Sequence, residues 1–111
     1  MYDKIKNWLK ERKKVIKMTT VEAIKNENAT LVDVREPFEL ETEGVVEGAI
    51  NIPMGDVPAR LEEFRNFSEP IVVFCRSGNR SGKIAQFLQE NGIEHIYNGG
   101  GFADVQEVLN S

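Results

Sequence analysis

The most apolar stretch of the chain lies near its centre and predicts a buried strand. Five apolar residues follow Pro70 without interruption, from Ile71 to Cys75. A continuous run of this length favours a strand that is covered on both faces, as in a parallel sheet. Shorter β-rich runs predict three further strands, at residues 30–35, 49–52 and 93–97.

Segments with apolar residues at helical spacing alternate with these strands. After the buried strand, Ile84, Phe87 and Leu88 lie on one face of a helix predicted over residues 80–91, and Gly92 provides its stop. Strands that alternate with helices predict an α/β domain with a mainly parallel sheet. The remaining predicted elements are a helix from Thr19 to about residue 28 with capping-box spacing between Thr19 and Glu22, a loop with about one helical turn at 36–48, a short helix at 58–64, a turn at 98–101, and a last helix marked by Phe102, Val105, Val108 and Leu109.

The first fourteen residues carry a pattern of their own. Ile5, Trp8 and Leu9 have helical spacing among lysines and arginines, which predicts a short amphipathic helix. We therefore divide the chain into an N-terminal extension, residues 1–14, and one domain, residues 15–111. An apolar stripe of this kind usually packs on its own domain, which is the interpretation we favour; the alternative is a docking surface for a partner or a membrane.

Length, charge and cysteine content narrow the class of protein. A chain of 111 residues fits one domain, and its net charge of −4 argues against a dedicated nucleic-acid-binding protein. No run approaches the ~20 apolar residues that span a bilayer, and the charged start lacks the apolar core of a signal peptide. The single cysteine excludes an intramolecular disulfide and favours a reducing compartment. We therefore expect a cytoplasmic protein that binds neither nucleic acid nor membrane.

A loop of small residues joins the buried strand to the following helix and begins with the only cysteine. In an open α/β sheet, ligands bind beyond the carboxyl ends of the strands, where Cys75 lies. Backbone N–H groups that converge before a helix favour an anion and stabilise a thiolate over a thiol. Arg76, Arg80 and Lys83 add positive charge. The loop is therefore predicted to be a cradle for an anion, with a nucleophile at its floor.

Two interpretations compete with a reactive cysteine. One is an inert buried side chain, and the other is a non-catalytic anion-binding loop. The position of Cys75 at a strand end, the two neighbouring arginines, the glycines and the following helix favour the reactive thiol.

Spacing within the loop discriminates between reaction classes. Cysteine phosphatases use Cys-x5-Arg, whereas four residues separate Cys75 from Arg80. Acyl transfer would use a Cys–His pair, and the only histidine, His95, lies in a predicted strand with no motif around it. One cysteine and one histidine do not make a metal-ligand set, so we expect no metal and no other cofactor. Sulfur transfer requires only an ionised thiol that attacks a sulfane sulfur while a stable anion leaves, and it fits these residues best.

Four short motifs in order resemble the rhodanese family over residues 15–111. They are Leu31–Glu36 (LVDVRE), Gly48–Pro53 (GAINIP), the six-residue loop Cys75–Arg80, and the double glycine Gly99-Gly100. The sequence departs from the family pattern at two places. The segment before Ala49 lacks the usual histidine and proline, and Phe102 is the nearest aromatic residue where the family commonly has a tryptophan.

The resemblance implies a rhodanese-like fold, with helices on both faces of a mainly parallel sheet, and a sulfurtransferase activity. Cys75 would form a persulfide, taking sulfur from thiosulfate or a related small anionic donor and passing it to a thiol or to cyanide. Asp33 and Arg35 would lie beside the loop, and we favour a structural, pocket-shaping role for them. The residues implied to bind the donor are Arg76, Ser77, Gly78, Asn79, Arg80 and Ser81.

The alternative function is a rhodanese-type sulfur carrier or anion-binding recognition module with little activity on free thiosulfate. Such a module would exchange sulfur with a partner protein, as donor or acceptor. The N-terminal extension motivates this alternative because it lies outside the resemblance.

Overall fold

Four parallel strands form the centre of the computed structural model, which describes residues 17–111. Their order across the sheet is β2-β1-β3-β4. Because all neighbouring strands are parallel, the segment between one strand and the next crosses back to the edge of the sheet where strands begin, and these segments contain the helices. The predicted helix over 2–14 and the boundary at residue 14 lie outside the described residues. The strands are β1 (Thr30–Asp33), β2 (Ile50–Asn51), β3 (Ile71–Cys75) and β4 (Ile96–Gly101).

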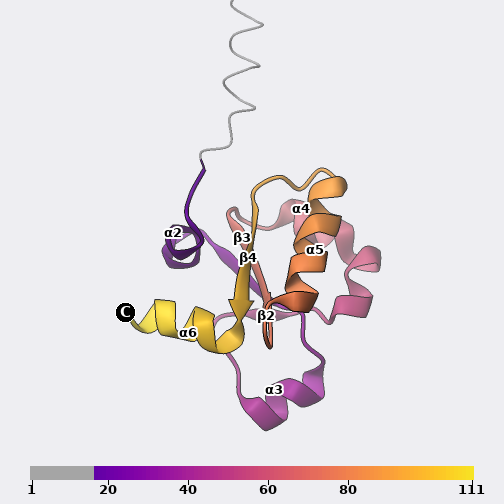
Figure 1. Ribbon diagram of the computed structural model, residues 1–111. Helices are drawn as coiled ribbons and strands as arrows, with labels where there is room; N and C mark the ends of the chain where they lie inside the picture. Colours follow the sequence, from indigo (N-terminus) through magenta and orange to yellow (C-terminus); the bar gives the residue numbers. More distant parts are fainter. Residues whose placement is uncertain (1–16) are drawn as a thin grey trace, which may run out of the picture.

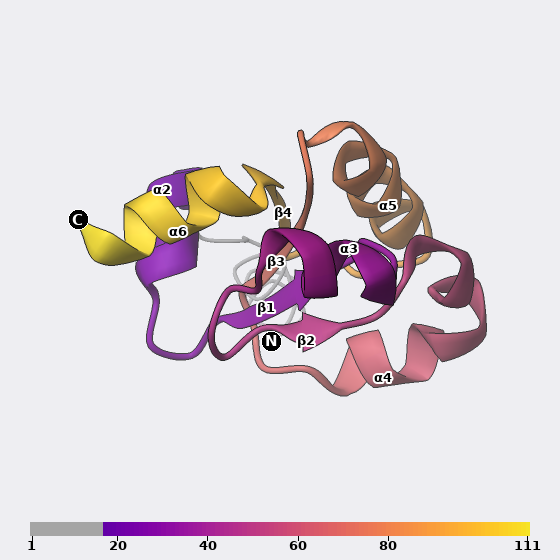
Figure 2. The same ribbon diagram turned by 90° about the horizontal axis from the view of Figure 1, so that it is seen from below.

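The central strand β3 is buried on both faces, as its composition predicts. Ile71, Val73 and Cys75 belong to one apolar cluster, whereas Val72 and Phe74 belong to another, because successive side chains point to opposite faces of a sheet. Helices cover both faces, as Figure 2 shows: α2 and α6 on one side, α4 and α5 on the other. Their bounds are α2 (Thr20–Lys25), α4 (Leu61–Asn66), α5 (Asn79–Glu90) and α6 (Phe102–Asn110). The prediction of an α/β domain with helices on both faces is therefore confirmed.

Helix α3 (Pro37–Glu43) lies at the carboxyl end of the sheet, where β4 also ends (Figure 1). It is longer than the single turn predicted for this acidic segment. Pro37 occupies the first helical turn, where a missing N–H costs nothing. The backbone N–H of Glu36 donates to the Glu39 carboxylate at 2.8 Å, which stabilises the start of the helix. The helix ends at Gly44, which has a φ of 99°.

The turn predicted at 98–101 is wrong, because these residues continue strand β4. Gly99 lies so close to its neighbours that an added Cβ would be 2.8 Å from a methyl of Val72 and 3.0 Å from one of Val105. Gly99 therefore allows α6 to pack tightly against the sheet, and Gly100 allows the left-handed backbone conformation, with a φ of 88°, that follows it.

Other boundaries also differ from the prediction: β1 ends at Asp33, before the predicted residue 35, and β4 begins at Ile96, after the predicted residue 93. Strand β2 has only two residues, and the helix predicted at 58–64 is divided. Its place is taken by the 3₁₀ turn η2 (Pro58–Arg60) and by α4, and a further 3₁₀ turn, η1 (Met54–Asp56), precedes them. Within residues 17–111, no helix is long and apolar enough to cross a membrane.

Candidate active site

The turn from β3 into α5 positions the candidate nucleophile. Cys75 is the last residue of β3, and Gly78 caps α5 with a φ of 97°. This left-handed conformation favours glycine. An added Cβ at Gly78 would also lie 3.2 Å from the Cα of Gly100 in β4. A glycine is therefore required both by the backbone conformation and by the neighbouring strand.

Cys75 is fully buried, and its Sγ faces the backbone of this turn. The N–H of Gly78 donates to Sγ at 3.1 Å, and the Oγ of Ser81 lies 3.3 Å from Sγ. The pKa of the thiol lies below its ordinary value. Burial raises that pKa, whereas hydrogen bonds from the backbone N–H groups of Ser81, Ser77 and Gly78 lower it. The Ser81 hydroxyl lowers it as well when it donates to Sγ, a contact in which either atom can be the donor. The turn therefore favours the thiolate despite its burial.

Both arginines of the loop are held by carboxylates of α3. Arg80 donates from two nitrogens to the two oxygens of Glu39, each at 2.8 Å. The Nε of Arg76 lies 3.1 Å from a carboxylate oxygen of Glu43, although the Arg76 side chain is two-thirds exposed. The Glu39 pKa falls to about 2: the hydrogen bond from Arg80 lowers it, burial opposes this, and the backbone N–H of Glu36 lowers it further. The positive charge expected around Cys75 is thus largely paired.

The loop residues differ in their surroundings. Ser77 and Asn79 are exposed on the surface, whereas Ser81 is fully buried. Lys83 is also exposed and lines, with Arg80, a hollow of about 510 Å³ whose other walls are mostly apolar.

Asp33 and Arg35 form a buried ion pair at the end of β1. The Arg35 Nη2 lies 2.6 Å from a carboxylate oxygen of Asp33 and donates to the carbonyl of Gly44 at 3.0 Å. The guanidinium carbon of Arg35 lies 4.1 Å from the centre of the Phe102 ring. The pair therefore connects β1 with the segment after α3 and with the start of α6. Phe102 is the aromatic residue that follows the double glycine, where the family commonly has a tryptophan.

Sequence reasoning missed three residues that contact the loop. Glu39 and Glu43 lie in the segment predicted to be mostly loop, and Asn98 lies in the predicted turn. The Asn98 side chain accepts from the Ser81 hydroxyl at 2.7 Å and donates to the Gly78 carbonyl at 3.0 Å. The only local signal was the spacing of Glu39 from Glu36, which fits a helix start; the contacts themselves join residues far apart in the sequence.

The site contains the parts for nucleophilic chemistry at sulfur and lacks a neighbouring histidine. The backbone carbonyl of His95 accepts from the N–H of Ile71, which starts β3, whereas Cys75 ends that strand. His95 therefore lies at the opposite end of the sheet, where its Nδ1 is 3.5 Å from Glu69. Among residues 17–111, no three His, Cys, Asp or Glu side chains form a group that could hold a metal ion.

Comparisons with known proteins match both the sequence and this architecture. The family model described as a rhodanese-like domain matches residues 18–107. The chain is 45% identical over 75 residues to the uncharacterized protein YqhL of Bacillus subtilis. The matched segment covers 67% of this chain and 58% of YqhL. It is 36% identical over 75 residues to the thiosulfate sulfurtransferase PspE of Escherichia coli. That match covers 67% of this chain and 71% of PspE.

A solved structure described as a rhodanese with anions, from Escherichia coli, has a similar fold. Its TM-score is 0.60 at 35% identity, and the match covers 68% of this chain and 89% of the other.

The ion pair between Glu39 and Arg80 predicts a pH-dependent loss of stability in Glu39→Gln. The folded-state pKa of Glu39, about 2, lies below the ordinary value of 4.5, so the pair stabilises the fold above pH 4.5 and loses this effect as the pH falls toward 2. We expect Glu39→Gln to lower the free energy of unfolding at pH 7 by about 2 kcal/mol, less than a fully buried pair because Arg80 is one-third exposed. Urea unfolding of both proteins at several pH values measures this difference.

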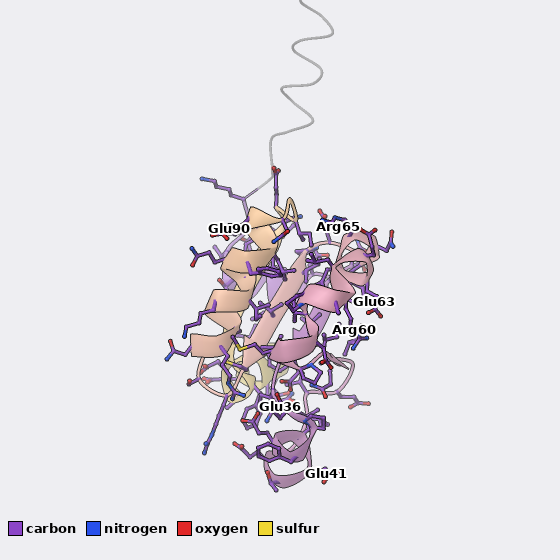
Figure 3. All side chains as sticks on the ribbon, turned by 90° about the vertical axis from the view of Figure 1, so that its right-hand side faces the viewer. Glu36, Glu41, Arg60, Glu63, Arg65 and Glu90 are labelled. Atoms are coloured by element: carbon purple, nitrogen blue, oxygen red, sulfur yellow. The ribbon has the colours of Figure 1, made fainter. Side chains whose placement is uncertain are left out.

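Glu41→Gln provides the control, because Glu41 lies on the same helix and is exposed at the outer end of the molecule (Figure 3). We expect this variant to change stability by less than about 0.5 kcal/mol. A difference between wild type and Glu39→Gln that stays constant down to about pH 3 would contradict the assigned pair.

Proposed function

The chain belongs to the family of rhodanese-like domains, and from that membership we propose that it is a sulfurtransferase that carries sulfane sulfur on Cys75 as a persulfide. The observation that carries the proposal is the hydrogen bond from the Gly78 N–H to a buried Sγ at the end of β3. A thiol with a lowered pKa in such a turn is prepared to attack an electrophilic sulfur.

The first half-reaction consumes the donor. The Cys75 thiolate attacks the outer sulfur of thiosulfate, a new S–S bond forms, and the old S–S bond breaks with its electron pair leaving on sulfite. The persulfide then carries one negative charge on its terminal sulfur. Backbone N–H groups of Ser77, Gly78 and Ser81, which face Sγ, are placed to stabilise charge in this cradle.

The second half-reaction returns the enzyme to its starting state. A thiolate or cyanide attacks the terminal sulfur, and the Cys75 thiolate leaves as the S–S bond breaks. Neither half-reaction needs a general base once the thiol is ionised, which is consistent with the distance of His95 from the site. The relative named as a thiosulfate sulfurtransferase supports this donor class.

A protein donor or acceptor, the alternative to free thiosulfate, is supported by the surface next to the loop. Phe38 of α3 and Val45 after it are 66% and 60% exposed. Val45, Glu43 and Phe102 line a hollow of about 650 Å³ between α3 and α6, and Glu43 also pairs with Arg76 of the loop. An apolar surface of this kind beside a nucleophile suits protein-to-protein exchange of sulfur.

The proposal also covers the cellular compartment and the domain boundary of the protein. A free thiolate fits a reducing compartment such as the cytoplasm. The domain would comprise residues 15–111, with residues 1–14 as an N-terminal extension.

Replacing Cys75 by serine should abolish sulfur transfer from thiosulfate to cyanide while the fold remains. Serine is nearly isosteric with cysteine, but its hydroxyl is not ionised at neutral pH and cannot form a persulfide. The wild type should show ping-pong kinetics, with parallel lines in double-reciprocal plots at several cyanide concentrations. Thiocyanate formation measures turnover, and circular dichroism checks the fold.

Donor binding is tested with Arg76→Ala and Arg80→Ala in the same assay. We expect a higher KM for thiosulfate in both, with the larger effect at Arg80 because its loss also releases Glu39. An unchanged KM in both variants, or turnover in Cys75→Ser, would contradict the proposed roles.

A further inference from the structure

The side chain of Asn98 is held in one orientation by two backbone groups. Its Nδ2 donates to the carbonyl of Gly78 at 3.0 Å, and its Oδ1 accepts from the N–H of Gly100 at 3.0 Å. Reversing the amide would place a donor against a donor and an acceptor against an acceptor. Gly82 leaves the room for this side chain, since an added Cβ there would lie 3.2 Å from Nδ2. The Oδ1 of Asn98 therefore faces Ser81 as an acceptor.

The hydroxyl of Ser81 lies between two groups and has one hydrogen. Asn98 Oδ1 is 2.7 Å from Ser81 Oγ, and Cys75 Sγ is 3.3 Å from it. Because a carbonyl oxygen cannot donate, the hydrogen points to Asn98 as long as that bond is kept. Cys75 is then the donor of the second contact, through its S–H group. This side-chain network of Cys75, Ser81 and Asn98 therefore matches the thiol, whereas the backbone N–H groups of the turn favour the thiolate.

Ionisation of Cys75 changes this balance. The thiolate has no hydrogen to donate and faces an oxygen lone pair, unless the Ser81 hydroxyl turns toward sulfur and leaves Asn98. Hydrogen bonds to charged groups are stronger than those between neutral groups, so the thiolate would gain from that turn. The interaction with Asn98 opposes it.

We propose that Asn98 is a positioning residue for the nucleophile, which holds the Ser81 hydroxyl hydrogen and withholds a donor that the Cys75 thiolate would otherwise receive. A consequence rests on the proposed function. In a persulfide the charge lies on the terminal sulfur, about 2 Å beyond Sγ, and Sγ itself is neutral. Ser81 can then stay bound to Asn98 without a penalty, so the same contact favours the loaded enzyme over the bare thiolate.

Apart from the exposed Lys83 of α5, the charged groups around Cys75 are paired with one another or with backbone, and the substitutions below leave all of them in place. They come from the loop and α5, from α3, from the end of β1 and from α6, and they are Arg76 with Glu43, Arg80 with Glu39, Asp33 with Arg35, and Asp104 with the N–H of Gly101.

The test is the pH titration of the Cys75 thiolate, followed by its ultraviolet absorbance with Cys75→Ser as baseline. All of the signal comes from one residue, because the chain has a single cysteine. Asn98→Ala releases the Ser81 hydroxyl, and we expect the midpoint to fall by about one pH unit. Ser81→Ala removes the donor, and in that background Asn98→Ala should produce no fall.

A merely structural role of Asn98 predicts the opposite direction. Loss of the anchors to Gly78 and Gly100 would loosen the turn, weaken the N–H bond to Sγ and raise the midpoint. An unchanged or raised midpoint in Asn98→Ala would therefore overturn the proposal, as would an equal fall in the Ser81→Ala background. The titration needs no sulfur donor, so its outcome is independent of whether thiosulfate is a substrate.

Asn98→Asp provides a second variant that keeps the acceptor for Ser81. Its side chain still holds the hydroxyl hydrogen and adds a negative charge, so we expect the midpoint to stay the same or rise. A fall in this variant would contradict the assignment even if Asn98→Ala were to disturb the fold. Asn98 is exposed, and neither substitution leaves a cavity in the core.

Discussion

The chemistry proposed for this site depends on one contact, the hydrogen bond from the N–H of Gly78 to the buried sulfur of Cys75. A buried thiolate is costly, and backbone donors that replace the lost water lower the pKa of the Cys75 thiol. Those donors converge because Gly78 adopts a left-handed conformation directly against Gly100. The reactivity of a single atom in β3 thus depends on how closely the next strand, β4, approaches the turn.

In the proposed mechanism, backbone dipoles favour an anion more than free cations do. The two arginines of the loop are engaged by Glu39 and Glu43 of α3, and the buried Arg35 is paired with Asp33. Paired charges orient the loop and hold α3 over the end of the sheet, but they add little net field at the sulfur.

Local patterns were sufficient to predict the elements that position Cys75, and they failed where distant residues meet. The apolar run of β3, the loop after Cys75 and helix α5 are adjacent in sequence, so the position of the cysteine at a strand end could be predicted. The contact between Glu39 and Arg80 spans 41 residues, and the one between Ser81 and Asn98 spans 17. Residues 98–101 were predicted to turn because glycine is common in turns, whereas here close packing by Val72 and Val105 requires it in a strand.

The central claim is that Cys75 carries sulfur, and the intact mass of the purified protein tests it most directly. After treatment with thiosulfate and removal of excess donor, the account predicts a gain of about 32 Da that cyanide or a reducing thiol reverses. The same treatment of Cys75→Ser should give no gain. A wild-type protein that is folded yet gains no mass from thiosulfate or from a protein persulfide donor would contradict the account, as would an adduct that persists in Cys75→Ser.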